Sequence, residues 1–563
     1  MKSFAVFLYY ICCGKGNNPF DNMKNVVLII FVVVMSACAQ KTAVDMLVVN
    51  ADVYTVNSNQ MKATAFAIHN GKFVEVGSTE ILKNKYSSNT LINVKGKPIY
   101  PGLIDAHCHF LGMGLVEQKV RLEGTKSFEE VLEKLIEFQD KYNLNYITGR
   151  GWDQNDWEIK EYPTKEKLDS LFPDVPVAIR RVDGHALLAN LAAIELAGVT
   201  KDTPFSGGDI LQEKGKLTGV FIDKPMELIL GTMPKPTKKE TTQALKLAEN
   251  KCFSLGLTTV NEAGLERDEI EIMDSLQKAS EMKMRVYAMA SANDANLNYY
   301  LKRGIYKTDR LNVRSFKYYG DGALGSRGAA MKASYSDKHN HHGALIYSVD
   351  YLKKTASRIA NSEFQMNTHA IGDSTNYIVL KTYKDALNGQ KDRRWKIEHA
   401  QIMDEDDFQY FDDIIPSVQP THATSDMYWA EDRVGAKRIK SSYAFKKLLN
   451  TYGKIALGTD FPVEQVNPML TFYAAVSRKD AKGYPENGFQ IENALSREET
   501  LKGMTIWAAY SNFEEHEKGS IEVGKLADFI ILDKDIMTVP IEEVLTTKVL
   551  KTFVNGELVY DNY

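Results

Sequence analysis

The sequence predicts an α/β protein built on an eight-stranded parallel (β/α)8 barrel of the TIM type. Its 563 residues are enough for one barrel of about 250 to 400 residues together with accessory domains. Amphipathic stretches such as 240–255 and 350–362 separate several short apolar segments, and this alternation is typical of a parallel barrel. The eight candidate barrel strands are 103–108, 257–261, 285–290, 315–319, 365–369, 395–399, 414–418 and 455–460.

Shorter β patterns occupy both ends of the chain. They cluster β-branched and apolar residues around turn signals such as Asn70-Gly71. The candidate strands are 45–58, 64–77 and 90–99 before the barrel, and 526–533 and 549–561 after it. Because chain termini are often close in space, we expect residues 45–100 and 519–563 to form one composite β-sandwich.

Within the barrel region, residues 101–518, the first two candidate strands are separated by a large insertion, residues 111–245. A short connection is the norm at this point of a βα unit. The insertion has candidate strands of its own in YITGRGW and VAIRRVDG, and a glycine-rich segment at 206–219. We expect it to fold over the barrel mouth as a lid that supplies the substrate pocket and excludes water.

Residues 1–44 resemble an upstream extension followed by a targeting segment. Lys24 precedes an apolar run from Val26 to Met35, which is shorter than the about 20 apolar residues of a confident membrane span. The segment is similar to a bacterial lipoprotein signal with Cys38 as the lipidated residue, although Met35 departs from the usual pattern. A plain signal peptide or a single anchor is the alternative. We therefore expect translation to start at Met23 and the protein to be exported to a bacterial envelope, on its periplasmic or surface side, where only the N-terminal lipid holds it to the membrane.

Side chains that bind metals end five of the candidate strands. His107 and His109 stand two residues apart, so they face the same way in a strand and can hold one metal together. The others are Lys317 in FKYYGDG, His369 in MNTHAIGD, His399 in WKIEHAQ and Asp460 in IALGTDFPV. The carboxyl ends of barrel strands are where active sites lie, and imidazole and carboxylate suit Zn²⁺ and related divalent ions. The pattern predicts a hydrolytic metal site with room for a catalytic water.

With these motifs the chain resembles the amidohydrolase superfamily, in the branch of N-substituted formamide deformylases and D-aminoacylase-like hydrolases. The resemblance covers most of the chain and includes RRVDGHALLAN at 180–190, FKYYGDGALGSRGAA at 316–330 and GSIEVGKLADFIILD at 519–533. It implies one or two divalent ions, with Zn²⁺ as the expected metal. The ligands it implies are His107 and His109 from the first strand, Lys317 from the fourth, and His369, His399 and Asp460 from strands five, six and eight.

Lys317 requires separate chemistry, because a protonated ammonium repels a cation. Burial beside metals disfavours the charged form and lowers the pKa of a lysine. The resemblance implies that the neutral amine takes up CO₂ and that the resulting carbamate bridges two ions. An ordinary lysine that pairs with Asp321 beside a single ion is the alternative.

Four further residues are candidates for contact with the substrate. His185 either reaches the substrate or caps a helix predicted for ALLANLAAIELAG, and His422 is either a contact on the catalytic face or a plain loop histidine. Trp152 is either part of an aromatic pocket wall or part of a small core within the insertion. Arg327 pairs with a substrate carboxylate, or else with Asp321 or Asp337.

The predicted activity is hydrolysis of the C–N bond of an N-acyl or N-formyl amide by metal-activated water, with Asp460 as general acid and base. His369 and His399 complete the predicted catalytic set. A cyclic amide, ester or lactone hydrolase on the same site is one alternative, because the fold does not determine the substrate, and a non-catalytic surface-binding lipoprotein is another. Lys and Arg number 69 against 73 Asp and Glu without a basic block, so a small amide is the expected partner and nucleic acid is not. A homo-oligomer is compatible with the sequence.

Overall fold

The computed structural model describes residues 41–562, apart from 60–61, 118, 144 and 233–235. Cys38 and the predicted targeting segment lie outside the described residues. At the centre is a sheet of eight parallel strands in chain order, with the short strand β19 (Tyr306–Lys307) antiparallel to β20 at its margin. The parallel strands are β10 (Leu103–Cys108), β17 (Leu257–Leu265), β18 (Arg285–Ser291), β20 (Leu311–Tyr319), β21 (Gln365–Ala370), β22 (Lys396–His399), β23 (Ile415–Val418) and β24 (Ala456–Leu457). The predicted fold class is confirmed.

The barrel closes through backbone bonds beyond the last strand. The Asp460 N–H donates to the His107 carbonyl at 2.8 Å, and the His109 N–H donates to the Phe461 carbonyl at 2.7 Å. The sequence predicts a last strand over 455–460, but β24 ends at Leu457. Asp460 has φ 64°, in the left-handed region, so the chain cannot stay extended there. The turn brings Asp460 to the rim beside the first strand.

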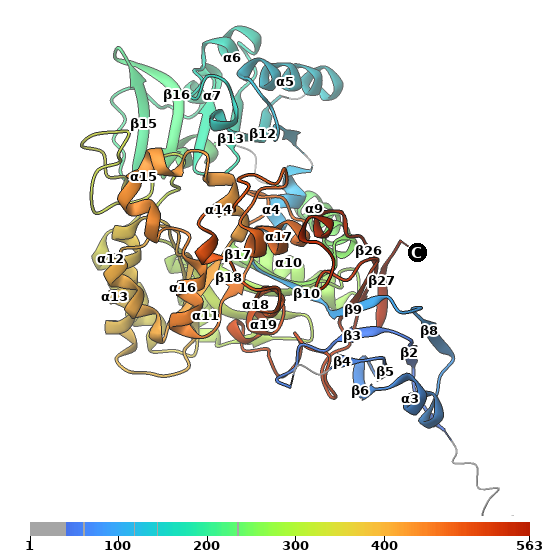
Figure 1. Ribbon diagram of the computed structural model, residues 1–563. Coiled ribbons are helices and arrows are strands. Elements are labelled where there is room, and N and C mark those ends of the chain that lie inside the picture. Colours follow the sequence, from blue (N-terminus) through green and yellow to red (C-terminus); the bar gives the residue numbers. More distant parts are fainter. Residues whose placement is uncertain (1–40, 60–61, 118, 144, 233–235, 563) are drawn as a thin grey trace, which may run out of the picture.

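Helices surround the barrel (Figure 1). The predicted amphipathic stretches fall in α9 and α12. In α9 the buried positions include Ala244, Leu245, Ala248 and Cys252, the spacing of a single helix face. The helices are α4 (Phe110–Val116), α9 (Lys238–Ser254), α10 (Arg267–Lys278), α11 (Asp294–Arg303), α12 (Val349–Ala360), α13 (Asp373–Leu387), α14 (Pro420–Asp426), α15 (Ala430–Arg438), α16 (Phe445–Tyr452), α17 (Pro468–Ser477), α18 (Arg497–Gly503) and α19 (Ile506–Ser511).

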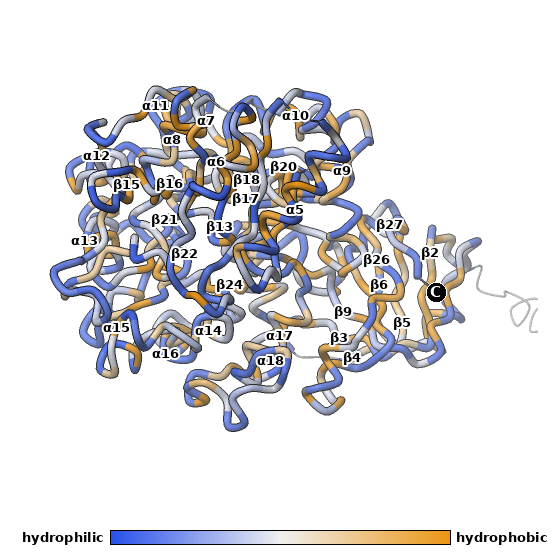
Figure 2. Tube along the Cα trace, turned by 90° about the horizontal axis from the view of Figure 1, so that it is seen from above, coloured by the Kyte–Doolittle hydropathy of each residue, from blue (hydrophilic) through white to orange (hydrophobic). Residues whose placement is uncertain are grey.

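Both chain ends build a β-sandwich at one side of the barrel (Figures 1 and 2). One sheet has the order β6-β5-β2-β8, and the other, β27-β26-β25-β9-β3-β4, combines strands from both ends. The strands are β2 (Met46–Val49), β3 (Asp52–Tyr54), β4 (Lys62–Ala63), β5 (Ala65–His69), β6 (Lys72–Gly77), β8 (Thr90–Asn93), β9 (Pro98–Pro101), β25 (Phe529–Leu532), β26 (Val549–Val554) and β27 (Glu557–Asp561), with α3 (Thr79–Lys85) and the pair β1 (Thr42–Ala43) and β7 (Tyr86–Ser87) beside them. Phe66, Phe73 and Phe529 pack together between the sheets. Asn70, at the predicted turn, and Asn555, in the turn between β26 and β27, have φ of 51° and 53°.

The insertion after β10 forms a separate six-stranded sheet with the order β11-β12-β13-β14-β16-β15. It lies on the side of the barrel away from the sandwich (Figure 1). Its strands are β11 (Val120–Arg121), β12 (Ile147–Trp152), β13 (Val177–Arg181), β14 (Ala186–Ala189), β15 (Gly208–Glu213) and β16 (Lys216–Asp223), and its helices are α5 (Phe128–Tyr142), α6 (Glu166–Leu171), α7 (Leu191–Leu196) and α8 (Met226–Leu230). No helix within the described residues is long and apolar enough to cross a membrane.

Candidate active site

The six predicted metal-binding side chains converge at the carboxyl ends of the barrel strands. The donor atoms of His107, His399 and Asp460 all lie within 4.8 Å of one another. His109 Nε2 lies 3.3 Å from Asp460 Oδ1, and Lys317 Nζ lies 3.0 Å from His107 Nε2. The ring centroids of His369 and His399 are 4.6 Å apart. The barrel thus gathers residues that are up to 353 positions apart in the chain.

Two of these histidines are oriented by neighbouring side chains. His107 Nδ1 lies 2.6 Å from Glu398 Oε2, and His399 Nδ1 lies 2.7 Å from the Gln419 side-chain oxygen. These bonds leave the Nε2 atom of each ring for the centre of the cluster, which is the usual arrangement around a metal-binding histidine. Burial would raise the pKa of Glu398, but His107 lowers it below its usual value, so the carboxylate is ionised beside the ring.

The donor set fits a divalent cation. Burial lowers the pKa of His369 and of His399 well below the usual value, so both rings are neutral and carry a free lone pair. Burial would raise the pKa of Asp460, but His109 and His422 hold it well below its usual range. In the described part of the chain, His369 Nε2 and Asp460 Oδ1 are buried without a hydrogen-bond partner. Neutral imidazole nitrogens and an ionised carboxylate are the ligands that Zn²⁺ and similar ions take.

Lys317 is buried within this cluster. Burial lowers the pKa of Lys317 to about 8, so a substantial fraction of the amine is neutral near pH 8. The alternative pairing with Asp321 is not formed. The Asp321 carboxylate instead accepts hydrogen bonds from the backbone of Ala330 and Gly372 and from the Thr375 hydroxyl.

His422 lies in α14 and faces the cluster. Its Nε2 is 3.3 Å from Asp460 Oδ2 and its Nδ1 is 3.1 Å from Glu464 Oε1. Burial would lower the pKa of His422, but the two carboxylates raise it to about 10. The ring is therefore a cation beside Asp460.

His185 comes from the insertion and also faces the cluster. Its Nδ1 lies 2.6 Å from Asp223 Oδ1, and its ring centroid is 5.2 Å from that of His369. The helix predicted to follow it is wrong over its first part, because residues 186–189 form β14 between β13 and β16. The helix begins only at Leu191, and Asn190 caps it. His185 therefore does not cap a helix, and it lines the cavity of the cluster.

Trp152 does not line the cavity, and its predicted role in a pocket wall is wrong. It is fully buried in the core of the insertion, 6.1 Å from Trp157 between ring centroids. Its indole N–H donates to the Ile179 carbonyl at 3.0 Å. An apolar ring at the end of β12 is more stable inside the insertion's own core than in a wet pocket.

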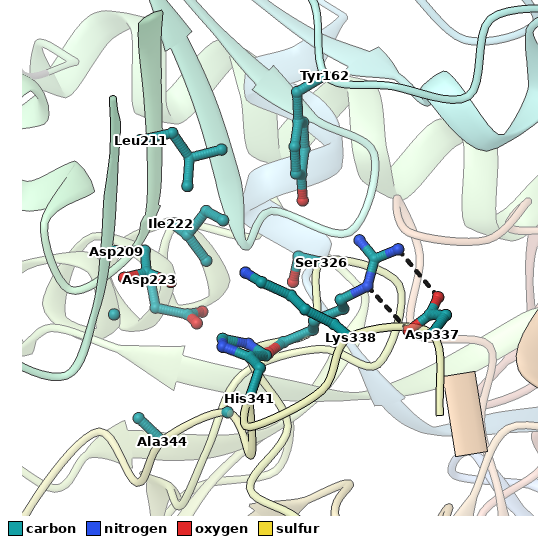
Figure 3. Close-up of a pocket in the computed structure, with 14 residues that line it drawn as sticks. Tyr162, Asp209, Leu211, Ile222, Asp223, Ser326, Asp337, Lys338, His341 and Ala344 are labelled. Carbon is teal, nitrogen blue, oxygen red and sulfur yellow. Dashed lines mark hydrogen bonds and ion pairs between the residues drawn. The ribbon is translucent and has the colours of Figure 1, made fainter. Parts of the chain in front are cut away.

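Arg327 lies at a neighbouring cavity of about 440 Å³ between the insertion and the loop after β20 (Figure 3). It does not line the cavity of the metal-binding cluster. Its guanidinium makes two bonds to Asp337, at 2.9 and 3.2 Å, which Figure 3 shows as dashed lines. Of the two predicted roles, the pairing with Asp337 is the one present.

The sequence reasoning missed several polar residues of the site. Glu398 and Gln419 orient the histidines, Glu464 contacts His422, and Tyr319 lies two residues after Lys317 on the same face of β20. Glu262 of β17 is also buried here, and its carboxylate accepts hydrogen bonds from the N–H groups of α4. A polar residue within or directly after an apolar barrel strand is a signal that could have found all of these except Glu464, since the six donors were found at the ends of candidate strands.

The cluster opens into a cavity of about 210 Å³, which His109, His185 and Tyr319 share with a second cavity of about 450 Å³. A barrel with buried imidazole and carboxylate donors at its strand ends has the architecture of a metal-dependent hydrolase. The profile of the amidohydrolase family matches residues 90–560, and the chain belongs to this family.

The chain is also similar to individual proteins over most of its length. The chain is 32% identical to Protein LONG AFTER FAR-RED 3 of Arabidopsis thaliana, over 92% of this chain and 91% of that protein. It is 24% identical to the N-substituted formamide deformylase of Arthrobacter pascens, over 92% and 98%. The crystal structure of an uncharacterized metal-dependent hydrolase from Pyrococcus horikoshii OT3 superposes with a TM-score of 0.73 at 27% identity, covering 88% of this chain and 99% of that one. The protein is thus a metal-dependent hydrolase of the amidohydrolase family.

Proposed function

We propose that this protein hydrolyses the C–N bond of an N-acyl or N-formyl amide. The observation that carries the proposal is the meeting of neutral imidazoles and the ionised Asp460 at one point, with cationic His422 3.3 Å from the same carboxylate. The similarity to an N-substituted formamide deformylase supports an amide as substrate. Ester, lactone and cyclic-amide substrates would use the same groups, so the experiment below includes them.

The residues that would hold the metal are the predicted ligands His107, His109, Lys317, His369, His399 and Asp460. Bound there, one or two Zn²⁺ ions would lower the pKa of a water and polarise the scissile carbonyl. For Lys317 we propose the carbamate form, in which the neutral amine adds to CO₂ and loses a proton. The lowered pKa of Lys317, about 8, supports this step because only the unprotonated amine reacts.

Asp460 is suited to move the proton. Its Oδ1 is buried without a hydrogen-bond partner among the described residues, and its low pKa keeps it ionised. In the proposed reaction the water oxygen bonds to the carbonyl carbon as Asp460 takes the water proton. Asp460 then delivers the proton to the nitrogen as the C–N bond breaks, which yields a carboxylic acid and an amine.

His422 and His185 are the candidates to stabilise the oxyanion that forms on the carbonyl oxygen. The His422 ring contacts Glu464 through Nδ1 and Asp460 through Nε2, and the His185 ring contacts Asp223 through Nδ1. The rings are therefore held in place before the charge develops, which is the condition for effective electrostatic stabilisation.

The test is metal analysis combined with a substrate panel. The full-length chain, purified in mild detergent, is loaded with Zn²⁺ and bicarbonate and assayed on N-formyl and N-acyl amines, esters, lactones and cyclic amides. We expect one or two bound ions, amide hydrolysis that a chelator abolishes and Zn²⁺ restores, and a carbamate carbon signal from ¹³C-bicarbonate that Lys317→Gln lacks. Cleavage of esters or lactones alone would favour the alternative substrates, and absence of both metal binding and turnover would contradict the proposal.

A further inference from the structure

Three arginines form a row across neighbouring strands of the insertion. Arg121 of β11 is in register with Arg150 of β12, and Arg150 is in register with Arg180 of β13. Register partners on adjacent strands project to the same face of a sheet. Like charges on adjacent strands are destabilising unless something compensates them.

The three arginines differ in the groups that lie next to their positive charge. Arg121 is exposed, and its guanidinium lies 3.0 Å from Glu117 and 3.7 Å from Glu123. Arg150 donates two hydrogen bonds to the Val182 carbonyl, at 3.2 and 2.7 Å, but has no ion pair within the described residues. These bonds fix the Arg150 guanidinium without neutralising it.

Arg180 has even fewer partners. Its guanidinium makes no hydrogen bond or ion pair in the part of the chain that the structure describes, although the side chain is partly buried. Burial lowers the pKa of Arg180 to about 10, so it remains a cation at neutral pH. Arg181, the next residue, projects to the other face and has two carboxylate partners, Asp153 and Asp183. The two consecutive arginines therefore differ, because Arg181 is paired with carboxylates and Arg180 is not.

Arg150 and Arg180 line the cavity of about 450 Å³ beside the metal-binding cluster. The buried carboxylates of this cavity are already engaged. Asp183 pairs with Arg181, Asp223 with His185, and Glu262 accepts hydrogen bonds from the N–H groups of α4. Neither arginine has an ion pair among the described residues, so both present positive charge to a cavity that Glu227 and Glu269 also line, although Asp183 favours the charged form of Arg150.

Tyr319 links this cavity to the donors. Its ring centroid is 5.0 Å from Lys317 Nζ and 5.9 Å from the His369 ring, and it lines both cavities. A molecule with its amide at the donors can therefore extend past Tyr319 toward the arginines.

We propose that Arg150 and Arg180 bind a carboxylate carried by the substrate, which makes this protein a hydrolase of anionic amides. Guanidinium groups match the two oxygens of a carboxylate with paired N–H donors. The inference rests on the proposed function, because it names the substrate class of the same site.

The test uses pairs of amides that differ only by a carboxylate. One pair places the acid on the amine side, N-formylphenylalanine against N-formylphenethylamine, and the other places it on the acyl side, N-benzylsuccinamate against N-benzylbutanamide. We expect kcat/KM to favour the acid at least about tenfold in one pair, and Arg180→Gln to lower kcat/KM for that acid by about 10- to 100-fold, the range of a charge-assisted hydrogen bond. The neutral partner should change less than about twofold.

Arg121→Gln is the matched control. It removes the same charge from the same row, but at a position with its own carboxylate partners, so substrate preference should stay as in the unchanged protein. Equal rates for acid and neutral partners in both pairs, unaltered by Arg180→Gln, would overturn the inference while leaving the amidohydrolase proposal intact.

A binding measurement separates the two proposals. In the Asp460→Asn background, isothermal titration with each acid reports affinity without turnover. We expect Arg180→Gln to weaken binding of the preferred acid about tenfold or more while the Tm stays equal or rises, because an uncompensated buried cation is removed. If the unchanged protein hydrolyses no amide but acid binding still depends on Arg180, the proposed reaction fails and the anion site stands. If neither acid binds, or if Arg180→Gln leaves the affinity unchanged, the anion site fails.

Discussion

The barrel rim and two arginines of the insertion face adjoining cavities, but they differ in whether their polar groups have side-chain partners. At the rim, His107 is held by Glu398, His399 by Gln419 and His422 by Glu464. In the insertion, Arg150 and Arg180 face the cavity with no carboxylate partner among the described residues. Groups that perform chemistry gain from being oriented before the substrate arrives. A cation that selects an anionic ligand must instead remain without a carboxylate partner until that ligand binds. In the two proposals, the barrel together with His185 performs the reaction, and Arg150 and Arg180 of the insertion select the substrate.

The largest expected effect lies on the barrel side. Asp460→Asn should lower kcat/KM by about 10² to 10⁴-fold, the usual contribution of a general acid and base, for acid and neutral amides alike. Steady-state kinetics together with metal analysis would measure it. Asp337→Asn is the control, since that carboxylate pairs with Arg327 away from the donors and its loss should cost less than about twofold. A loss in Asp460→Asn confined to the anionic amides would contradict the assignment of the reaction to the barrel and of substrate selection to Arg150 and Arg180.

An intermediate effect is expected where the rim orients its ligands. Glu398→Gln removes the charge bound to His107 Nδ1 and should weaken metal affinity by about 10- to 100-fold, as is typical of residues that support a ligand. Competition with a chelating dye would measure it. Glu464→Gln makes the same chemical change beside His422, which is not a predicted ligand, and should leave metal affinity within about threefold. Equal losses in both variants would show that carboxylates around the cavity act on the metal collectively.

The smallest effect is expected in the insertion. Gly184 has φ 78°, and a Cβ there would lie 3.3 Å from Arg150 Nη2, so Gly184→Ala should shift the guanidinium and raise KM for the anionic amide by about three- to tenfold. Metal affinity should not change. Gly198→Ala imposes the same left-handed strain, at φ 64° with nothing within 4 Å, and should lower stability by about 1 to 2 kcal/mol without altering KM. A change in metal affinity in Gly184→Ala would contradict the expectation that the surroundings of Arg150 affect substrate binding and not metal binding.

Much of the barrel was predictable because parallel barrel strands are buried on both faces and appear as continuous apolar runs. All eight strands lie where such runs occur, and the six donors lie in or shortly after five of them. Residues 186–189 were mispredicted because a short apolar run does not distinguish a strand from a buried helix. Pairing with β13 and β16 decides in favour of a strand. The role of Trp152 stayed open between a pocket wall and the core of the insertion, because residue type alone does not tell which of two apolar environments a ring enters.

The sequence by itself determined the barrel, the order of its donors and their position at the strand ends, because these depend on local periodicity and on the side chain that follows each apolar run. Only the tertiary structure decided which groups share an environment. Glu398 meets His107 across 291 positions of the chain. Arg180 and Arg181 are identical neighbours in the sequence, yet one pairs with two carboxylates and the other with none that the structure describes. Charge compensation depends on distances in space, and folding sets those distances: Arg181 meets Asp153 and Asp183 within the insertion, and Glu398 meets His107 within the barrel.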